Sequence, residues 1–241
     1  MKMENTRNLF GGEPLFSGPR RVAAPLEREY SRIEEWAHAV THGIGALSGV
    51  GGLSLLIYKS VQSGTGAVIS ALIFGISLVL LYTASFSYHT SCALFGENTE
   101  SKVRDFFMKC DHSMIYVLIL GTYAPACISA LGGTLGYLVL GAVGALCILG
   151  IVLNVVDVEK YKKISMLLYV IAGWTIALVS VPYLRAVGTN GFLLLILGGL
   201  LYTIGIFFYN MKRIPYMHLI WHLFVIAGSV MHFFMVYMYC I

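Results

Sequence analysis

Two pairs of histidines in this sequence have a spacing suited to metal binding. His218 and His222, in the stretch HLIWH, are four residues apart, and so are His38 and His42. Residues i and i+4 share one face of a helix, so each pair directs two imidazoles the same way. Two such histidines and a third from another helix commonly bind zinc and leave a position open for water. Spacing alone does not choose between the two pairs, and histidines hydrogen-bonded to backbone or lipid headgroups are the simpler interpretation.

Two further polar stretches supply groups that could complete such a site. SFSYH places Ser85 four residues before His89, and KCDHS supplies Asp111. The structural interpretations are a serine bonded to its own helix and an aspartate favoured by the dipole at a helix N-terminus. The chemical interpretation starts from HLIWH, which lacks the general-base glutamate of HExxH motifs. In a hydrolytic site Asp111 would therefore have to take the acid–base role.

The elements that position these residues are predicted from composition. The chain has 241 residues, of which 58% are hydrophobic and 12% charged, whereas soluble domains have about 25% charged residues. We predict an all-α, polytopic membrane protein, with residues 1–30 as a mostly disordered cytoplasmic tail and residues 31–241 as the membrane domain. A transmembrane helix needs about 20 apolar residues, and seven runs satisfy this length: 37–58, 66–88, 111–131, 134–154, 164–183, 190–209 and 216–238.

The distribution of basic residues predicts the orientation of the chain. Of its 16 lysines and arginines, all but Lys59 and Arg185 lie in the N-terminal tail or in the loops after the second, fourth and sixth predicted spans. Cytoplasmic loops carry the excess of positive charge. We therefore predict a multi-pass protein of the inner (plasma) membrane with a cytoplasmic N-terminus and an external C-terminus. The positive charges are scattered among loops, which argues against a nucleic-acid partner.

This orientation brings most of the intramembrane ionisable residues to one depth, near the cytoplasmic face. Ionisable groups within a bilayer are costly and are functional candidates. His232 lies about 15 Å further along the last helix than His222, and we predict a hydrogen-bonded core histidine there. Pro125 predicts a kink in the third span. The residues that converge in depth are Glu35, His38, His42, His89, Asp111, His218 and His222.

The same stretches resemble those of a known family. EEWAHAVTHGIGA, SFSYHTS, KCDHSMIYVLILGTYAP and HLIWHLFVIAGSVMHFF are similar to motifs of the bacterial hemolysin III proteins. These proteins belong with the progestin and adiponectin (PAQR) receptors, in a superfamily that includes alkaline ceramidases. The resemblance covers residues 31–238. It implies a Zn²⁺ ion on the cytoplasmic side, bound by His89, His218 and His222, with Asp111 beside a zinc-bound water and Ser85 as the motif serine.

The resemblance also assigns roles to the other pair of histidines, those of the first span. His42 matches a motif histidine that is not a ligand, and His38 has no ligand counterpart. Glu35 and His42 are then expected to hold the first span against the bundle or to contact the ligands from outside.

Three functions follow from these expectations. The first is zinc-dependent hydrolysis of a lipid amide or ester, in which Asp111 moves the proton and Ser85 donates to the developing oxyanion. The second is a non-catalytic, zinc-stabilised sensor or regulator of membrane lipids. Pore formation, which the family name suggests, has the least support because no predicted span carries a polar stripe. Membrane lipids are the expected partners, while the sequence determines neither the substrate nor the oligomeric state.

Overall fold

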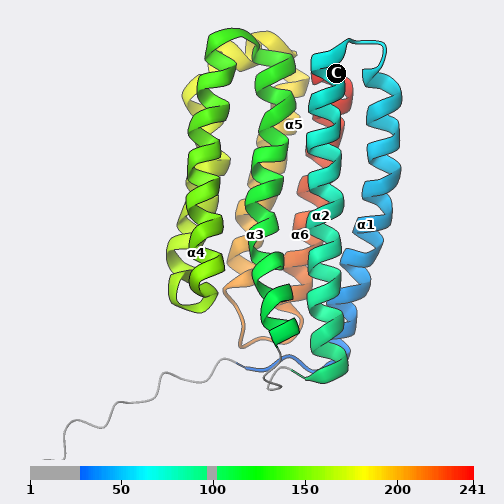
Figure 1. The fold of residues 1–241 in the computed structure, drawn as a ribbon, viewed down its shortest axis with the longest axis vertical. Coiled ribbons are helices and arrows are strands. Elements are labelled where there is room, and N and C mark those ends of the chain that lie inside the picture. Colours follow the sequence, from blue (N-terminus) through cyan, green and yellow to red (C-terminus); the bar gives the residue numbers. More distant parts are fainter. Residues whose placement is uncertain (1–27, 97–101) are drawn as a thin grey trace, which may run out of the picture.

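The computed structural model describes residues 28–96 and 102–241. The predicted tail, residues 1–30, lies outside the described residues except for its last three. Within the described ranges the chain is helical and contains no strand, and the helices run side by side along one axis (Figure 1). The elements are α1 (Arg32–Ser60), α2 (Thr65–Phe95), α3 (Lys102–Ala124), η1 (Pro125–Leu131), α4 (Gly133–Trp174), η2 (Thr175–Val179), α5 (Ser180–Tyr209), α6 (Met217–Met235) and η3 (Val236–Cys240).

Five helical stretches are long and apolar enough to cross a membrane, which confirms the prediction of a helical membrane protein. The longest, Gly133–Tyr209, has 77 residues. A straight helix of that length would measure about 115 Å, nearly four times the hydrocarbon thickness of about 30 Å. The stretch is instead interrupted by non-helical backbone at Asp157 (φ −164°, ψ 104°) and Gly188 (φ 69°, ψ 175°). The chain turns back within this stretch at both ends of the bundle (Figure 1).

The connection between α2 and α3 is shorter than predicted. The sequence predicts a loop at about residues 89–110, but α2 continues to Phe95 and α3 already begins at Lys102. The ion pair between Asp105 and Lys109, 3.2 Å apart and one turn from each other, stabilises this polar start of α3. Asp111 therefore lies well inside α3, and the interpretation as a helix N-terminal carboxylate is wrong.

Two local features fix where helices begin or change geometry. Ser31 and Glu34 form a capping box at the start of α1: each side chain accepts a hydrogen bond from the other residue's backbone N–H, at 3.3 and 2.9 Å. At Pro125 the α-helical α3 gives way to the π-helical η1, because proline has no N–H to donate. Where the sequence predicts a kink at Pro125, the structure has a change of helix type.

Small residues allow α1 and α2 to pack closely. A Cβ atom on Gly45 would lie 2.7 Å from the ring of Tyr82, which is closer than any real contact. Small residues at such positions are how membrane helices approach one another. The close approach of α1 to α2 brings the polar residues near the start of α1 next to those near the end of α2.

Candidate metal centre

Five histidines from three helices gather at one end of the bundle, and we call them the histidine cluster: His38 and His42 of α1, His89 of α2, and His218 and His222 of α6. The ring centroid of His38 lies 4.8 to 5.3 Å from those of His218, His89 and His222. The ring of His42 stacks on that of His222 with 3.6 Å between centroids and an interplanar angle of 8°. The convergence expected from depth is therefore present in the fold.

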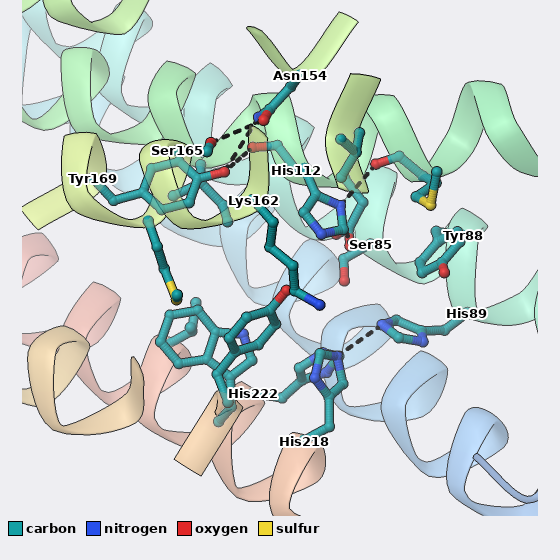
Figure 2. A pocket seen from close by; sticks show the side chains of 18 of the residues that line it. Ser85, Tyr88, His89, His112, Asn154, Lys162, Ser165, Tyr169, His218 and His222 are labelled. Atoms are coloured by element: carbon teal, nitrogen blue, oxygen red, sulfur yellow. Dashed lines mark hydrogen bonds and ion pairs between the residues drawn. The ribbon is translucent and has the colours of Figure 1, made fainter. Parts of the chain in front are cut away.

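The ring nitrogens of three of these residues face one another. The Nε2 atom of His218 lies 3.4 Å from Nε2 of His89 and 3.1 Å from Nε2 of His222 (Figure 2). Zinc binds histidine nitrogen at about 2.0–2.1 Å, so two nitrogens on a tetrahedral zinc are about 3.3 Å apart. Both separations fit nitrogens that share one metal ion.

A second set of three overlaps with this one. Ligand atoms of His38, His89 and His218 all lie within 4.8 Å of one another, and this group could hold a metal ion. Both ring nitrogens of His38 are buried and have no hydrogen-bond partner among the described residues. The resemblance gave His38 no role as a ligand, so its place in the centre of the cluster is a new observation. The two sets share His89 and His218 and differ in the third histidine.

Helix α1 orients the histidines of the other two helices. The Nδ1–H of His89 donates to Oε2 of Glu35 at 2.6 Å. The Thr41 hydroxyl donates to the His38 carbonyl at 2.8 Å, which leaves its oxygen to accept from Nδ1 of His222 at 3.3 Å. A proton on Nδ1 leaves the lone pair of Nε2 directed into the cluster, and such outer partners are typical of metal-binding histidines. The contact made by Glu35 agrees with its expected outer role; Thr41 was missed because a threonine at this position has no distinctive sequence signal.

The buried carboxylate of Glu34 is hydrogen-bonded to the backbone just before α6. Glu34 is 2% exposed and accepts hydrogen bonds from the backbone N–H of Tyr216 at 2.8 Å and from the Arg28 side chain. Tyr216 adopts a left-handed conformation (φ 63°), which costs a non-glycine residue about 1–3 kcal/mol. His218 follows two residues later. Glu34 therefore stabilises the strained turn that directs His218 into the cluster.

Residues just before α1 also contact the cluster. The ring centroid of Tyr30 lies 5.1 Å from that of His38 and 5.2 Å from that of His218. Tyr30 belongs to the segment that the sequence assigned to the disordered tail. Its aromatic contacts and the ion pair of Arg28 with Glu34 hold this part of the segment against the bundle.

A cavity opens beside the histidine cluster. Its lining includes all five residues expected at the site: Ser85, His89, Asp111, His218 and His222. Ser85 is buried, and the Asp111 side chain is 18% exposed. Figure 2 shows Ser85 and His89 extending from α2 into this space. The structure thus brings the candidate acid and the candidate hydroxyl to the cavity that the histidines line.

A second cavity adjoins the first. Both are lined by Ile115, Tyr169, Ile206 and Trp221. The lining of the second cavity is largely apolar and extends along the bundle to His232. The first cavity therefore carries the polar side chains, and the more apolar second cavity lies next to it.

Fold and site together define a helical membrane protein with a histidine-based candidate metal centre at one end of its bundle. The family described as Haemolysin-III related matches residues 30–233, and the chain belongs to this family. The matched region includes every residue of the histidine cluster.

Named relatives agree with this assignment. The chain is 40% identical over 209 residues to the hemolysin-3 homolog of Bacillus subtilis. This alignment covers 86% of the chain and 95% of that protein. It is also 40% identical over 207 residues to hemolysin-3 of Bacillus cereus, covering 86% and 91%. The human monocyte to macrophage differentiation factor is 28% identical over 219 residues, covering 90% and 89%.

Proposed function

We propose that the protein binds Zn²⁺ through His89, His218 and His222. The 3.1 and 3.4 Å separations of their Nε2 atoms support this set, as do the outer hydrogen bonds of His89 and His222. We further propose that the chain crosses the inner membrane seven times, with the reversals at Asp157 and Gly188 dividing the long apolar stretch into three passes. The excess of basic residues then puts the histidine cluster on the cytoplasmic side.

The choice of third ligand has its own test. With His222 as the ligand, His222→Ala lowers the zinc affinity strongly, whereas His38→Ala changes it little. A metal-binding titration in which His38→Ala lowers the zinc affinity more than His222→Ala would make His38 the third ligand.

We propose that the protein hydrolyses an amide or ester bond of a membrane lipid. The observation that carries this proposal is the cavity that joins the histidines to Asp111, Ser85 and an adjoining apolar space. A lipid would place its scissile bond and headgroup beside the polar side chains of the first cavity and its acyl chains in the second. An apolar lining with a few polar groups is typical of small-molecule binding sites.

The chemistry divides between the ion and the side chains. When bound by three neutral imidazoles, zinc lowers the pKa of a coordinated water to about 7 and polarises carbonyl oxygens. The Asp111 carboxylate accepts a proton within the cavity and returns it to the leaving group. The Ser85 hydroxyl donates a hydrogen bond to the oxygen on which negative charge develops. The apolar lining excludes water and strengthens both interactions.

An assay of purified protein tests this proposal. Amide and ester lipids are incubated with wild-type protein, Asp111→Asn and Asp105→Asn, and fatty-acid release is measured together with zinc content. Asp105 lies six residues before Asp111 on α3 and pairs with Lys109 on the surface, so it is a matched control. We expect Asp111→Asn to lose turnover with zinc retained and Asp105→Asn to resemble wild type. Zinc-loaded wild type without turnover above Asp111→Asn would contradict a hydrolase.

One observation favours a second function, a zinc-stabilised sensor of membrane lipids. The cluster and its outer contacts tie together α1, α2 and α6, so a bound ion would fasten three helices at one end of the bundle. If the protein is a sensor, Asp111→Asn should change neither its zinc content nor its lipid binding. In that case neither the wild type nor any variant should release fatty acid.

A further inference from the structure

A lysine reaches the candidate site from the turn within α4. Lys162 lines the cavity beside the histidine cluster, and its side chain is 17% exposed. Figure 2 shows it extending across the cavity toward His218 and His222. The proposed reaction assigns this ammonium group no role. A charged group is costly to place in a largely apolar cavity, and within membranes such groups mark ligand sites.

The neighbours of Lys162 show that its position is specific. Lys160 and Lys163 belong to the same turn but are exposed and do not line the cavity. General attraction to an anionic membrane surface would involve all three lysines alike. Of these three lysines, Lys162 is the one that lines the cavity.

A second lysine reaches the same cavity from another connection. Lys212, between α5 and α6, lines the cavity and lies over the ring of Tyr209, with 5.8 Å from Nζ to the centroid. The adjacent Arg213 is exposed and does not line it. Two connections far apart in the sequence thus each contribute one lysine to the cavity and leave a neighbouring basic residue outside.

The acidic groups that line this cavity in the described part of the chain are Asp111 and Glu159. Glu159 lies 3.8 Å from Lys162, but its side chain is 66% exposed, so water screens this pair. Asp111 has a role in proton transfer under the proposed function. The charge of a bound Zn²⁺ would add to that of the two lysines and favour an anion between them.

We propose that Lys162 and Lys212 bind the anionic headgroup, a phosphate or carboxylate, of the lipid that enters the cavity. This inference rests on the proposed function and narrows its substrate class to anionic lipids. The headgroup lies between the two lysines, the scissile bond faces the histidine cluster and Asp111, and an acyl chain extends into the apolar cavity. Hydrogen bonds between an ammonium group and a phosphate oxygen are among the stronger ones in proteins.

Photo-crosslinking tests headgroup selection without requiring turnover. The purified protein is reconstituted in zwitterionic vesicles with one of two probes that carry the same diazirine acyl chain. One probe is a phosphatidic acid and the other an uncharged diacylglycerol. Labelling of cavity peptides is measured for wild type, Lys162→Gln, Lys162→Arg and Lys163→Gln, and for Lys212→Gln against Arg213→Gln.

We expect wild type to prefer the anionic probe and Lys162→Gln to lose that preference about tenfold, the effect of one charged hydrogen bond. Lys162→Arg should keep the preference, as should the two surface controls. Equal labelling of both probes by wild type, or an equal loss in Lys163→Gln, would overturn the inference. Binding of inorganic phosphate without any labelling by the anionic probe would also overturn it, because the anion bound would then not be a lipid.

Failure of this inference is distinguishable from failure of the proposed hydrolysis. A wild-type protein that releases fatty acid without preferring the anionic probe contradicts only the inference. A protein that prefers the anionic probe without releasing fatty acid contradicts only the hydrolysis.

Discussion

The two ends of α6 both bury histidine, but they satisfy it in different ways. Toward the C-terminal end, Nε2 of His232 donates to the carbonyl oxygen of Leu195 at 3.2 Å, which confirms the expected core histidine. At the other end, Nε2 of His218 faces the Nε2 atoms of His89 and His222. A nitrogen that faces a carbonyl needs no ligand, whereas nitrogens that face one another need a shared proton or a metal ion.

The serine hydroxyl groups near the two ends of α6 differ in the same way. Near His232, Ser229 bonds with Tyr82 at 2.7 Å and with Tyr202 at 2.8 Å, and these bonds tie α2, α5 and α6 together. Near the cluster, Ser85 lines an open cavity instead. The comparison indicates that the polar groups near His232 bond to other protein groups, whereas those of the histidine cluster face one another and the first cavity.

Removal of the metal should have the largest effect, and it should affect the two ends of α6 differently. At a free zinc concentration about a thousand times Kd, the ion stabilises the folded protein by about 4 kcal/mol. Chelation in detergent should therefore lower the Tm of wild type and speed amide exchange near His218, while exchange near His232 changes little. Equal acceleration at both ends of α6 would remove the distinction between them.

The next effect concerns the two serines of α2. Ser85→Ala should lower kcat about 10²- to 10³-fold, the usual cost of losing one oxyanion donor, with zinc content unchanged. Ser87→Ala is the control, because the Ser87 hydroxyl donates to the Thr83 carbonyl of its own helix at 2.8 Å. Similar kcat values for the two variants would mean that Ser85 is only a packing residue.

A smaller effect is expected when the hydrogen bond between Glu35 and His89 is weakened. Glu35→Gln keeps the size of the side chain but weakens the 2.6 Å bond to Nδ1 of His89. Loss of such a partner lowers metal affinity about 10- to 100-fold. A competition titration with a zinc indicator measures it, with Asp105→Asn as the control. An unchanged Kd would show that Glu35 supports the fold alone.

The smallest effect is expected from the hydrogen bond between Tyr82 and Ser229. Tyr82→Phe removes the hydrogen bond to Ser229 and should destabilise the protein by about 1 kcal/mol. Zinc affinity should stay at the wild-type value. A clear drop in zinc affinity would show that the two ends of the bundle are coupled, and thermal unfolding measured beside a zinc titration separates these outcomes.

The sequence predicted the helical membrane fold and the convergence of histidines, because hydropathy, charge bias and i,i+4 spacing are local or additive signals. The family was predicted from the resemblance of four motifs. The connections were misjudged. Hydropathy reports where polar residues begin but not where a helix ends, so the polar start of α3 was assigned to a loop. The turn at Asp157 was likewise predicted as a longer loop.

Contacts that depend on the tertiary fold were not predictable. Nothing local marks Tyr216 as left-handed or Glu34 as its hydrogen-bond acceptor 182 residues away. Lys162 could not be told from Lys160 and Lys163 before the cavity was known. His38 was set aside because motif resemblance assigns roles by position in the sequence, whereas the candidate metal group depends on distances in space.

Zinc content of the purified protein tests the central claim most directly. Wild type, His218→Ala and His232→Ala are prepared in parallel and measured by elemental analysis. We predict stoichiometric zinc in wild type and in His232→Ala, and its loss in His218→Ala. The same zinc content in all three proteins, or none in well-folded wild type, would contradict a metal centre in the histidine cluster.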